Sequence, residues 1–300
     1  MANDFVRPAP IPPLLIRQAL IGWSSEESDR SVLDYVDMIS KWAPIESAFL
    51  LHVVLRFEDL APHSPEATGQ ELGAAWVRSM KQAVDGHVAA ADRIFWEFEV
   101  REGQVADELA LTASDLQADL VCIGRMEQAS LAPELVRVVP QSLLIVPSFF
   151  RPRIGKILVA VDFSAPSVRA FRQACALAAR QDKPASITCL HFYELPEPKY
   201  LAGAGALNDL AREVYIQREK AFQAFLEENL PEAPFSVSSE IHPARAGEIA
   251  TALSRYAREE RFDLVVMGAG SHSEAEEIKA GTVAESFIRH TPDIALWMIR

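Results

Sequence analysis

Short apolar runs alternate with longer amphipathic segments along the chain. In the second half, apolar or alternating runs rich in β-branched residues predict β-strands. These strands are expected at Lys156–Asp162, Ser186–Phe192, Phe235–Ile241, Leu264–Met267 and Ile294–Ile299. Apolar residues at helical spacing predict helices between them. The helices are expected directly after a Ser164 cap and at Leu207–Asn229, Gly247–Glu260 and Val283–Arg289.

The first half of the chain shows the same order of segments. Its strands are expected at Gln18–Trp23, Ser47–Val54, Ile94–Val100, Asp119–Gly124 and Gln141–Pro147. Its helices are expected at Glu26–Trp42, Gln70–Val88 and Val105–Leu116. The run Asp119–Gly124 repeats Asp263–Gly268 at an offset of 144 residues. We therefore interpret the chain as two copies of one domain.

Strands that alternate with helices form βαβ units, in which the strands are parallel and the crossovers right-handed. We predict an α/β fold of two tandem domains, each a five-stranded parallel sheet with helices on both faces. The expected domains are residues 1–150 and 151–300. In such sheets, ligands bind beyond the carboxyl ends of the strands, where the strand order reverses. Asp162, Phe192 and Gly268 are all expected at such ends.

Charge and composition exclude several classes of function. The formal net charge of −13 argues against a nucleic-acid partner, because proteins that bind nucleic acid concentrate Lys and Arg. Cys122, Cys175 and Cys189 lie in apolar surroundings without a Cys-x-x-Cys pair, which favours buried thiols over a disulfide or a metal site. No apolar run approaches the ~18 residues of a membrane helix. Because no signal-peptide pattern is recognised either, we expect a cytoplasmic protein.

The most specific chemistry lies between Gly268 and Val283. Gly268 ends an apolar run, a polar loop follows, and Gly281 stands directly before Thr282 and an amphipathic segment. A helix that starts at this point would present unpaired N–H groups, which favour anions such as phosphate. Thr282 is equally suited to be a plain helix cap that needs no ligand.

The spacing of these residues resembles the Gly-x2-Gly-x9-Gly-(Ser/Thr) pattern of the universal stress protein family. Gly268, Gly281 and Thr282 fit that pattern, whereas Ser271 stands where the family has its second glycine. The family also ends its first strand in an aspartate, as the second half does with Asp162.

The resemblance covers residues 156–300 well and residues 18–147 more weakly. The chain as a whole therefore resembles the tandem members of the family. This resemblance implies a Rossmann-like fold of the adenine nucleotide alpha hydrolase type. It also implies an intramolecular pseudo-dimer, with a homodimer as a further form.

The resemblance further implies an adenine nucleotide site, for ATP, in the second domain. Asp162 would contact the adenine or ribose, and the Phe192 backbone the adenine edge. The implied contacts to ribose and phosphates come from Gly268, Ser271, Gly281, Thr282 and Val283. No nucleophile–base pair and no metal-ligand spacing is recognised, so we expect no catalytic residue and at most weak ATP hydrolysis.

The first copy lacks much of this apparatus. Ser24 stands where the second copy has Asp162. The chain advances 16 residues from Gly124 to Pro140 but 24 from Gly268 to Pro292, so roughly eight residues of the phosphate loop and helix start are missing. We expect this copy to bind no nucleotide and to act as a structural partner.

Two interpretations of the loop after Gly268 remain open. Glu274, Glu276 and Glu277 lie where a triphosphate would be bound. Either they recruit Mg²⁺ beside the nucleotide, or they form a solvated acidic loop on a domain that no longer binds ATP.

The sequence therefore leaves two main hypotheses for function. One is a stress-response regulator that binds ATP through its C-terminal domain. The other is a ligand-free interaction scaffold that has lost nucleotide binding. An adenylating enzyme of a related fold is disfavoured, because neither a catalytic base nor a substrate pocket can be named.

Three further side chains are candidates for packing roles in the core. His52 and His191 end equivalent strands and are expected to be packed and hydrogen-bonded rather than ligands. Trp297, in the last strand, is interpreted either as an interface residue or as a core residue.

Overall fold

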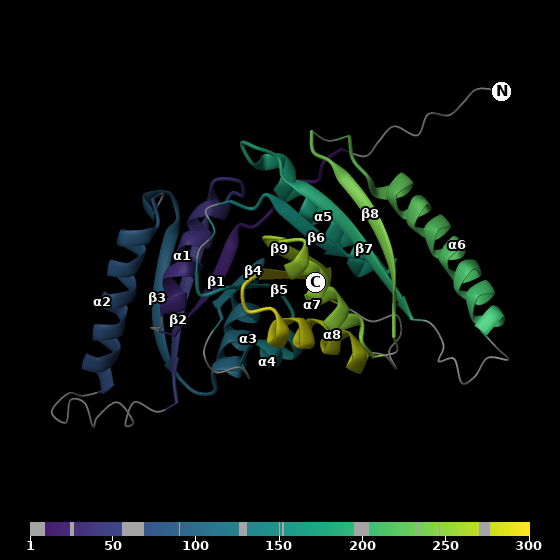
Figure 1. The fold of residues 1–300 in the computed structure, drawn as a ribbon. Helices are drawn as coiled ribbons and strands as arrows, with labels where there is room; N and C mark the ends of the chain where they lie inside the picture. The colour runs from purple at the N-terminus through teal and green to yellow at the C-terminus, as the bar shows by residue number, and fades with distance from the viewer. Residues whose placement is uncertain are drawn as a thin grey trace. The chain divides into compact units, whose positions relative to one another are not determined.

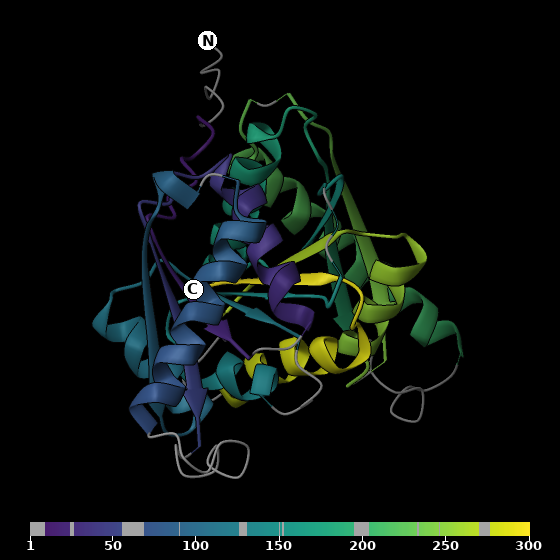
Figure 2. The same cartoon turned by 90° about the vertical axis from the view of Figure 1, so that its left-hand side faces the viewer.

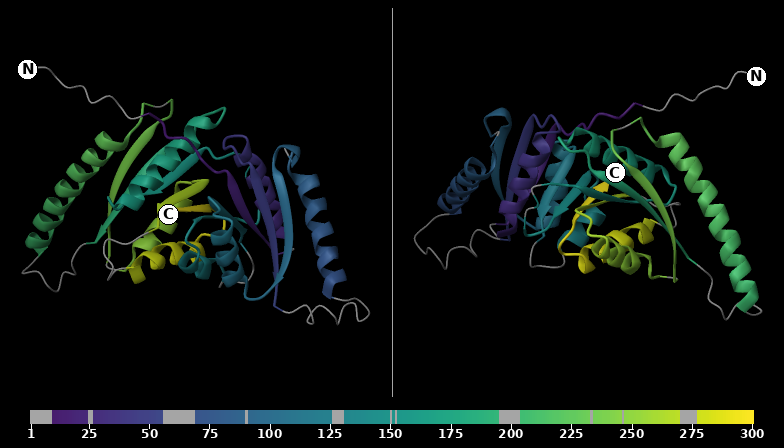
Figure 3. Two further views of the ribbon diagram at one scale, coloured as in Figure 1. Left: turned by 180° about the vertical axis from the view of Figure 1, so that it is seen from behind. Right: turned by 45° about the horizontal axis from the view of Figure 1, so that its top comes forward.

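The computed structural model describes most of the chain. The described residues are 10–24, 27–55, 69–89, 91–125, 131–149, 151, 153–194, 204–232, 234–245, 247–269 and 277–300. The chain divides into two compact units, which the figures show from several sides (Figures 1–3). One unit holds Leu14–Arg153, Thr291–Met298 and Arg300, and we call it the first unit. The second unit holds Met1–Pro13, Ile154–His290 and Ile299.

Most of the described elements are close to those expected from the sequence. The strands are β1 (Gln18–Trp23), β2 (Ser47–Val54), β3 (Phe95–Glu102), β4 (Leu120–Gly124), β5 (Ser142–Val146), β6 (Lys156–Ala160), β7 (Ser186–Glu194), β8 (Val237–Ala244), β9 (Leu264–Gly268) and β10 (Ala295–Ile299). The helices are α1 (Glu27–Ser40), α2 (Gly69–His87), α3 (Val105–Asp115), α4 (Leu131–Val138), α5 (Ala165–Arg180), α6 (Ala204–Asn229), α7 (Ile249–Glu259) and α8 (Glu277–His290), with a short 3₁₀ turn η2 (Ala91–Arg93).

In the first unit the strands follow the order β3-β2-β1-β4-β5-β10. The pairs among β1 to β5 are parallel. Helices α1 and α2 cover one face of this sheet and α3 and α4 the other (Figure 2). Apart from Ser142 at the start of β5, strands β4 and β5 are apolar and buried, as expected for a parallel sheet that is covered on both sides.

The second unit repeats this arrangement with the order β9-β6-β7-β8, all parallel. Helix α5 packs across β6, β7 and β9, and α6 runs beside β8 on the edge of the sheet (Figure 3). Helices α7 and α8 pack against each other. The predicted α/β class, with parallel strands and covering helices, is confirmed.

Strand β10 takes a place that the repeat pattern does not predict. It pairs antiparallel with β5, and Trp297 lies opposite Leu144. The Trp297 side chain is buried, with 5% of its surface exposed. The last strand of the sequence thus joins the sheet of the first unit, and Trp297 is a packed residue there.

The two copies differ in the helix before their last strand. Helix α4 has 8 residues and α8 has 14. Six of the roughly eight missing positions therefore come from the helix, and the others come from the connection that precedes it. The expected start of the last helix also changes, because α8 begins at Glu277 rather than beside Thr282.

Each unit has a glycine at the point where its first helix meets the end of a strand. A Cβ on Gly268 would lie 2.4 Å from the carbonyl carbon of Pro166, in the first turn of α5. A Cβ on Gly124 would lie 2.9 Å from Cβ and Oγ of Ser28, in α1. Pro166 and Ser28 occupy matching positions in the two copies. Close packing between helix and strand therefore accounts for both glycines.

The close contact predicts a graded series of alanine substitutions. Gly268→Ala should destabilise the protein most, by about 1–3 kcal/mol, because the new methyl group meets backbone that cannot move aside. Gly124→Ala should cost less, since it meets mainly a side chain. Gly86→Ala is the control, because nothing lies within 4 Å of a Cβ there, and replacing a helical glycine should stabilise by roughly 0.5–1 kcal/mol. The midpoints of urea unfolding measure the series, and equal midpoints for all three variants would contradict it.

Candidate functional site

The strand order reverses beside β6 in the second unit. Strand β7 follows β6 on one side, and β9, which comes later in the chain, pairs with its other side. The gap beyond the carboxyl ends of β6 and β9 is therefore the switch point at which such sheets bind ligands. Asp162 lies two residues after β6, and Gly268 is the last residue of β9. The structure brings these two predicted residues to the two sides of one switch point.

The turn after β6 is held by its own side chains. Oδ1 of Asp162 accepts hydrogen bonds from the backbone N–H of Ser164, at 3.0 Å, and from its hydroxyl. The Ser164 Oγ in turn accepts from the N–H of Ser167, at 3.3 Å, so Ser164 caps α5 as predicted. Asp162 itself remains exposed to solvent. One carboxylate oxygen thus fixes the turn while the group reaches the surface at the strand ends.

Phe163 has a backbone conformation that is rare for a bulky residue. Its φ is 65°, in the left-handed region that side chains with a Cβ disfavour. The ring packs against His191 (centroids 4.5 Å apart), Phe222 (5.6 Å) and Phe225 (6.1 Å). This aromatic packing offsets the backbone strain and fixes the direction in which Asp162 leaves the strand.

The remaining predicted residues occupy different parts of the second unit. Phe192 lies in β7, and its ring packs against His242 with the centroids 5.9 Å apart. Gly281, Thr282 and Val283 lie within α8, beyond its first turn, because the helix begins at Glu277. The unpaired N–H groups of the helix start therefore belong to residues that precede Gly281. Ser271 lies outside the described residues.

The acidic loop lies outside the described residues in part. Glu274 and Glu276 are not among the described residues, and Glu277 opens α8.

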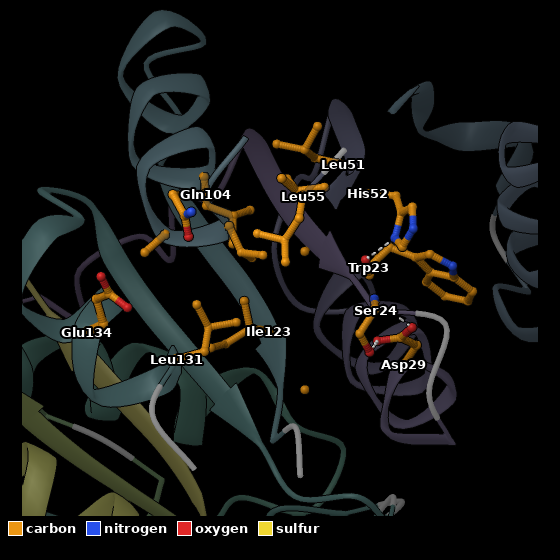
Figure 4. A pocket seen from close by; sticks show the side chains of 16 residues that line it. Trp23, Ser24, Asp29, Leu51, His52, Leu55, Gln104, Ile123, Leu131 and Glu134 are labelled. Carbon is orange, nitrogen blue, oxygen red and sulfur yellow. Dashed lines mark hydrogen bonds between the residues drawn. The ribbon is translucent and has the colours of Figure 1, made fainter. Parts of the chain in front are cut away.

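The first unit contains a cavity of about 450 Å³ at the matching switch point, between the ends of β1 and β4 (Figure 4). The sequence predicted no ligand apparatus there. Aliphatic side chains supply much of the wall, and several polar residues join them. The lining residues are Gly22, Trp23, Ser24, Asp29, Leu51, His52, Val53, Leu55, Gln104, Val105, Ala106, Leu109, Ile123, Gly124, Leu131 and Glu134.

A buried carboxylate takes a prominent place in this cavity. Asp29, in α1, has 1% of its surface exposed. Its Oδ2 accepts from the backbone N–H of Ser24 and its Oδ1 from the Ser24 hydroxyl, both at 2.9 Å (Figure 4). Ser24 stands at the strand end where the second copy has Asp162. The carboxylate at this turn comes instead from Asp29, five residues later in α1. Sequence comparison at matched positions could not find Asp29, because its counterpart in the second copy is Ser167.

The two units share a buried histidine at the end of the second strand. Nδ1–H of His52 donates to the Trp23 carbonyl at 2.8 Å, and Nδ1–H of His191 donates to the Val161 carbonyl at 2.7 Å. Each bond ties the second strand to the end of the first. The expectation of packed, hydrogen-bonded histidines is confirmed.

Burial changes the titration of these groups. Desolvation lowers the pKa of His52 and His191 below the usual 6.5, and the bond to a backbone carbonyl opposes that shift in both. Burial raises the pKa of the Cys122 and Cys175 thiols to about 12, which keeps both protonated and unreactive. Cys189 is shifted in the same direction, also mainly by burial.

The described part of the chain holds neither a metal-binding cluster nor a membrane-spanning helix. No group of three or more His, Cys, Asp or Glu side chains there is placed to hold a metal ion. Within the same residues, no helix combines the length and apolar character needed to cross a bilayer.

The buried histidines predict how stability depends on pH. Between the lowered folded pKa and 6.5, the unfolded chain binds protons that the folded protein does not. The free energy of unfolding should therefore fall as the pH drops below about 6.5 and level off below the folded pKa values. The variant His52→Asn keeps a donor toward Trp23 but does not titrate, so its pH dependence should be shallower. Urea unfolding between pH 5 and 8 measures this, with the exposed His290→Asn as control. Identical profiles for His52→Asn and the wild type would contradict the prediction.

Comparison with known protein families gives a match for the second half of the chain. The sequence model of the Universal stress protein family matches residues 153–296. No curated protein sequence matches the chain.

Two solved structures align with almost the whole chain. A universal stress protein from Archaeoglobus fulgidus aligns with 96% of this chain and 97% of its own, at 15% identity and a TM-score of 0.61. The functionally unknown protein PA1789 from Pseudomonas aeruginosa aligns with 95% of this chain and 92% of its own, at 14% identity and a TM-score of 0.61. Similarity at this level of identity concerns the fold. Together with the matched segment, it leads to one conclusion: residues 153–296 form a domain of the universal stress protein family, and the chain as a whole shares the fold of these two solved proteins.

Proposed function

We propose that the protein is a cytoplasmic stress-response regulator that binds an adenine nucleotide, ATP, through its C-terminal domain. The observation that carries this proposal is the pair Asp162 and Gly268 on the two sides of the switch point between β6 and β9. The carboxylate at the end of β6 is exposed, and it stands in the segment that the family pattern matches.

The chemistry of this edge suits a nucleoside. An exposed carboxylate beside a strand end accepts hydrogen bonds from ribose hydroxyls or from an adenine amino group. Asp162 is held by Ser164 and by the packed turn at Phe163, so its position does not have to be ordered when a ligand arrives. The backbone of Phe192, at the next strand, would meet the adenine edge.

The phosphate part of the site is proposed on the family pattern. Ser271 would approach the ribose and phosphates through its backbone. Gly281, Thr282 and Val283 would contribute once a bound phosphate unwinds or shifts the start of α8, since they now lie inside that helix. Mg²⁺ held by the loop glutamates would balance the negative charge. On this view hydrolysis is weak or absent.

A ligand-free scaffold is the second candidate, and specific contacts favour it. Gly268 is explained by its contact with Pro166, and Asp162 by the turn that it holds. Neither residue then needs a ligand to account for it. In that case the protein would act through its exposed helices and sheet edges on a protein partner.

The direct test is a titration of the full chain with ATP and Mg²⁺, followed by calorimetry. Asp162→Asn is the informative variant, because its Oδ1 still accepts from Ser164 while the second terminal atom changes from acceptor to donor. We expect it to weaken ATP binding about tenfold, as removal of a charge-assisted hydrogen bond typically does. Ser24→Ala, at the matching position of the first domain, is the control and should leave ATP binding unchanged.

Stability gives an independent measurement. ATP at 100 times its dissociation constant should raise the free energy of unfolding by ~2.7 kcal/mol. Native mass spectrometry of the purified protein would also detect a retained nucleotide. The nucleotide hypothesis is wrong if calorimetry shows no heat of binding, if ATP does not raise the free energy of unfolding, and if mass spectrometry finds no retained nucleotide. The scaffold is then the better description.

A further inference from the structure

We propose that the first domain is a binding site in its own right, and that its cavity takes a small organic amine with an apolar body rather than a phosphate ester. The cavity of about 450 Å³ at the switch point of β1 and β4 is the basis of this proposal. Small-molecule sites typically have such a volume and a mostly apolar wall with a few polar groups. This inference stands apart from the nucleotide site proposed for the second domain.

The apolar wall of the cavity favours a ligand with a non-polar ring or chain. Aliphatic side chains from strands β2 and β4, from the residue after β2 and from helices α3 and α4 line the space, and Figure 4 shows them between the polar groups. These side chains are Leu51, Val53, Leu55, Leu109, Ile123 and Leu131. Leu55 is 61% exposed and lies at the open side of the wall. A ring or short hydrocarbon chain would gain by contact with this wall.

The carboxylates in the lining favour a ligand with a positive charge. Asp29 and Glu134 contribute carboxylates from opposite sides of the cavity (Figure 4). No Lys or Arg is among the described lining residues. Because two carboxylates, and no cation among the described residues, line the space, a phosphate there would be repelled and a protonated amine attracted.

His52 adds an acceptor rather than a positive charge. Its Nδ1–H is used by the Trp23 carbonyl, which leaves Nε2 as the acceptor nitrogen. Burial lowers the pKa of this imidazole, so the ring is neutral at neutral pH. His52 therefore adds an acceptor to the two carboxylates of the lining, which suits a ligand that carries N–H groups.

The start of α3 is a feature of the lining that by itself favours an anion. Gln104, Val105 and Ala106 place the first turn of this helix on the cavity wall. The same turn carries Asp107 and Glu108, and Glu108 is paired with Arg101 at 3.7 Å. The charge of Asp107 offsets the positive end of the helix dipole.

The second domain differs at each of these positions. Ser167 stands where the first domain has Asp29, and the exposed Asp162 stands where it has Ser24. The buried carboxylate and the shortened helix α4, which brings Glu134 to the cavity, occur together in the first domain. We infer that the loss of the nucleotide pattern in this half was accompanied by a different ligand preference.

The test compares amines and acids of the same shape on the full-length protein. The probes are phenethylamine, tyramine and tryptamine, each paired with the propionate that carries the same ring. Calorimetry at neutral pH and low salt should show binding of at least one amine, with its paired acid about tenfold weaker or more. AMP should not compete with the amine.

Variants locate the site and separate it from the nucleotide site. Asp29→Asn should weaken amine binding about tenfold or more, and Glu134→Gln should weaken it by a smaller factor. Asp115→Asn removes an exposed acidic charge from the far end of α3, which does not line the cavity, and should have little effect. Asp162→Asn should leave amine binding unchanged, whatever it does to ATP.

Three results would overturn the proposal. They are the failure of all three amines to bind at millimolar concentration, acids that bind as tightly as their paired amines, and amine affinity that is unchanged in both Asp29→Asn and Glu134→Gln. Circular dichroism checks that each variant is folded. Because Glu134 is exposed, Glu134→Gln remains informative if the buried Asp29→Asn fails to fold.

Discussion

The structure depends on the close contact between the start of one helix and the end of one strand in each unit. Pro166 lies against Gly268, and Ser28 lies against Gly124, at distances that leave no room for a side chain on either glycine. Because protein interiors are close-packed, this contact fixes where α5 and α1 begin relative to their sheets. It therefore also fixes the turn between the first strand and its helix, and with it the group presented at the switch point.

The two copies use this common frame with different chemistry. In the second domain, Asp162 stands on the turn itself, holds it through Ser164 and stays exposed. In the first domain, Ser24 takes that place and a buried carboxylate, Asp29, holds the turn from the helix side. Each carboxylate accepts a backbone N–H of its own turn, from Ser164 in the second domain and from Ser24 in the first. They leave different charges at the strand ends, and this difference is what would separate their ligands.

Packing behind the switch point makes the frame rigid. The buried histidine of each unit ties the second strand to the carbonyl at the end of the first. In the second unit, the aromatic cluster around Phe163 holds a strained backbone conformation in place. A preorganised turn lowers the entropy that a ligand must remove on binding. The same rigidity would serve a scaffold, so it does not choose between the two functions.

The sequence by itself determined the strands, most of the helices, the cap at Ser164 and the paired histidines, because these follow from local periodicity and from the repeat. It also placed Asp162 and Gly268 at the strand ends. Only the tertiary structure decided that β10 pairs antiparallel with β5, since a buried strand has the same apolar pattern beside any neighbour. Likewise, only packing revealed the contact that requires Gly268 and the carboxylate of Asp29 in a cavity. The contact at Gly268 and the place of Asp29 both depend on residues of different elements that come together only in the folded chain. A linear sequence pattern does not show which of these residues lie close together.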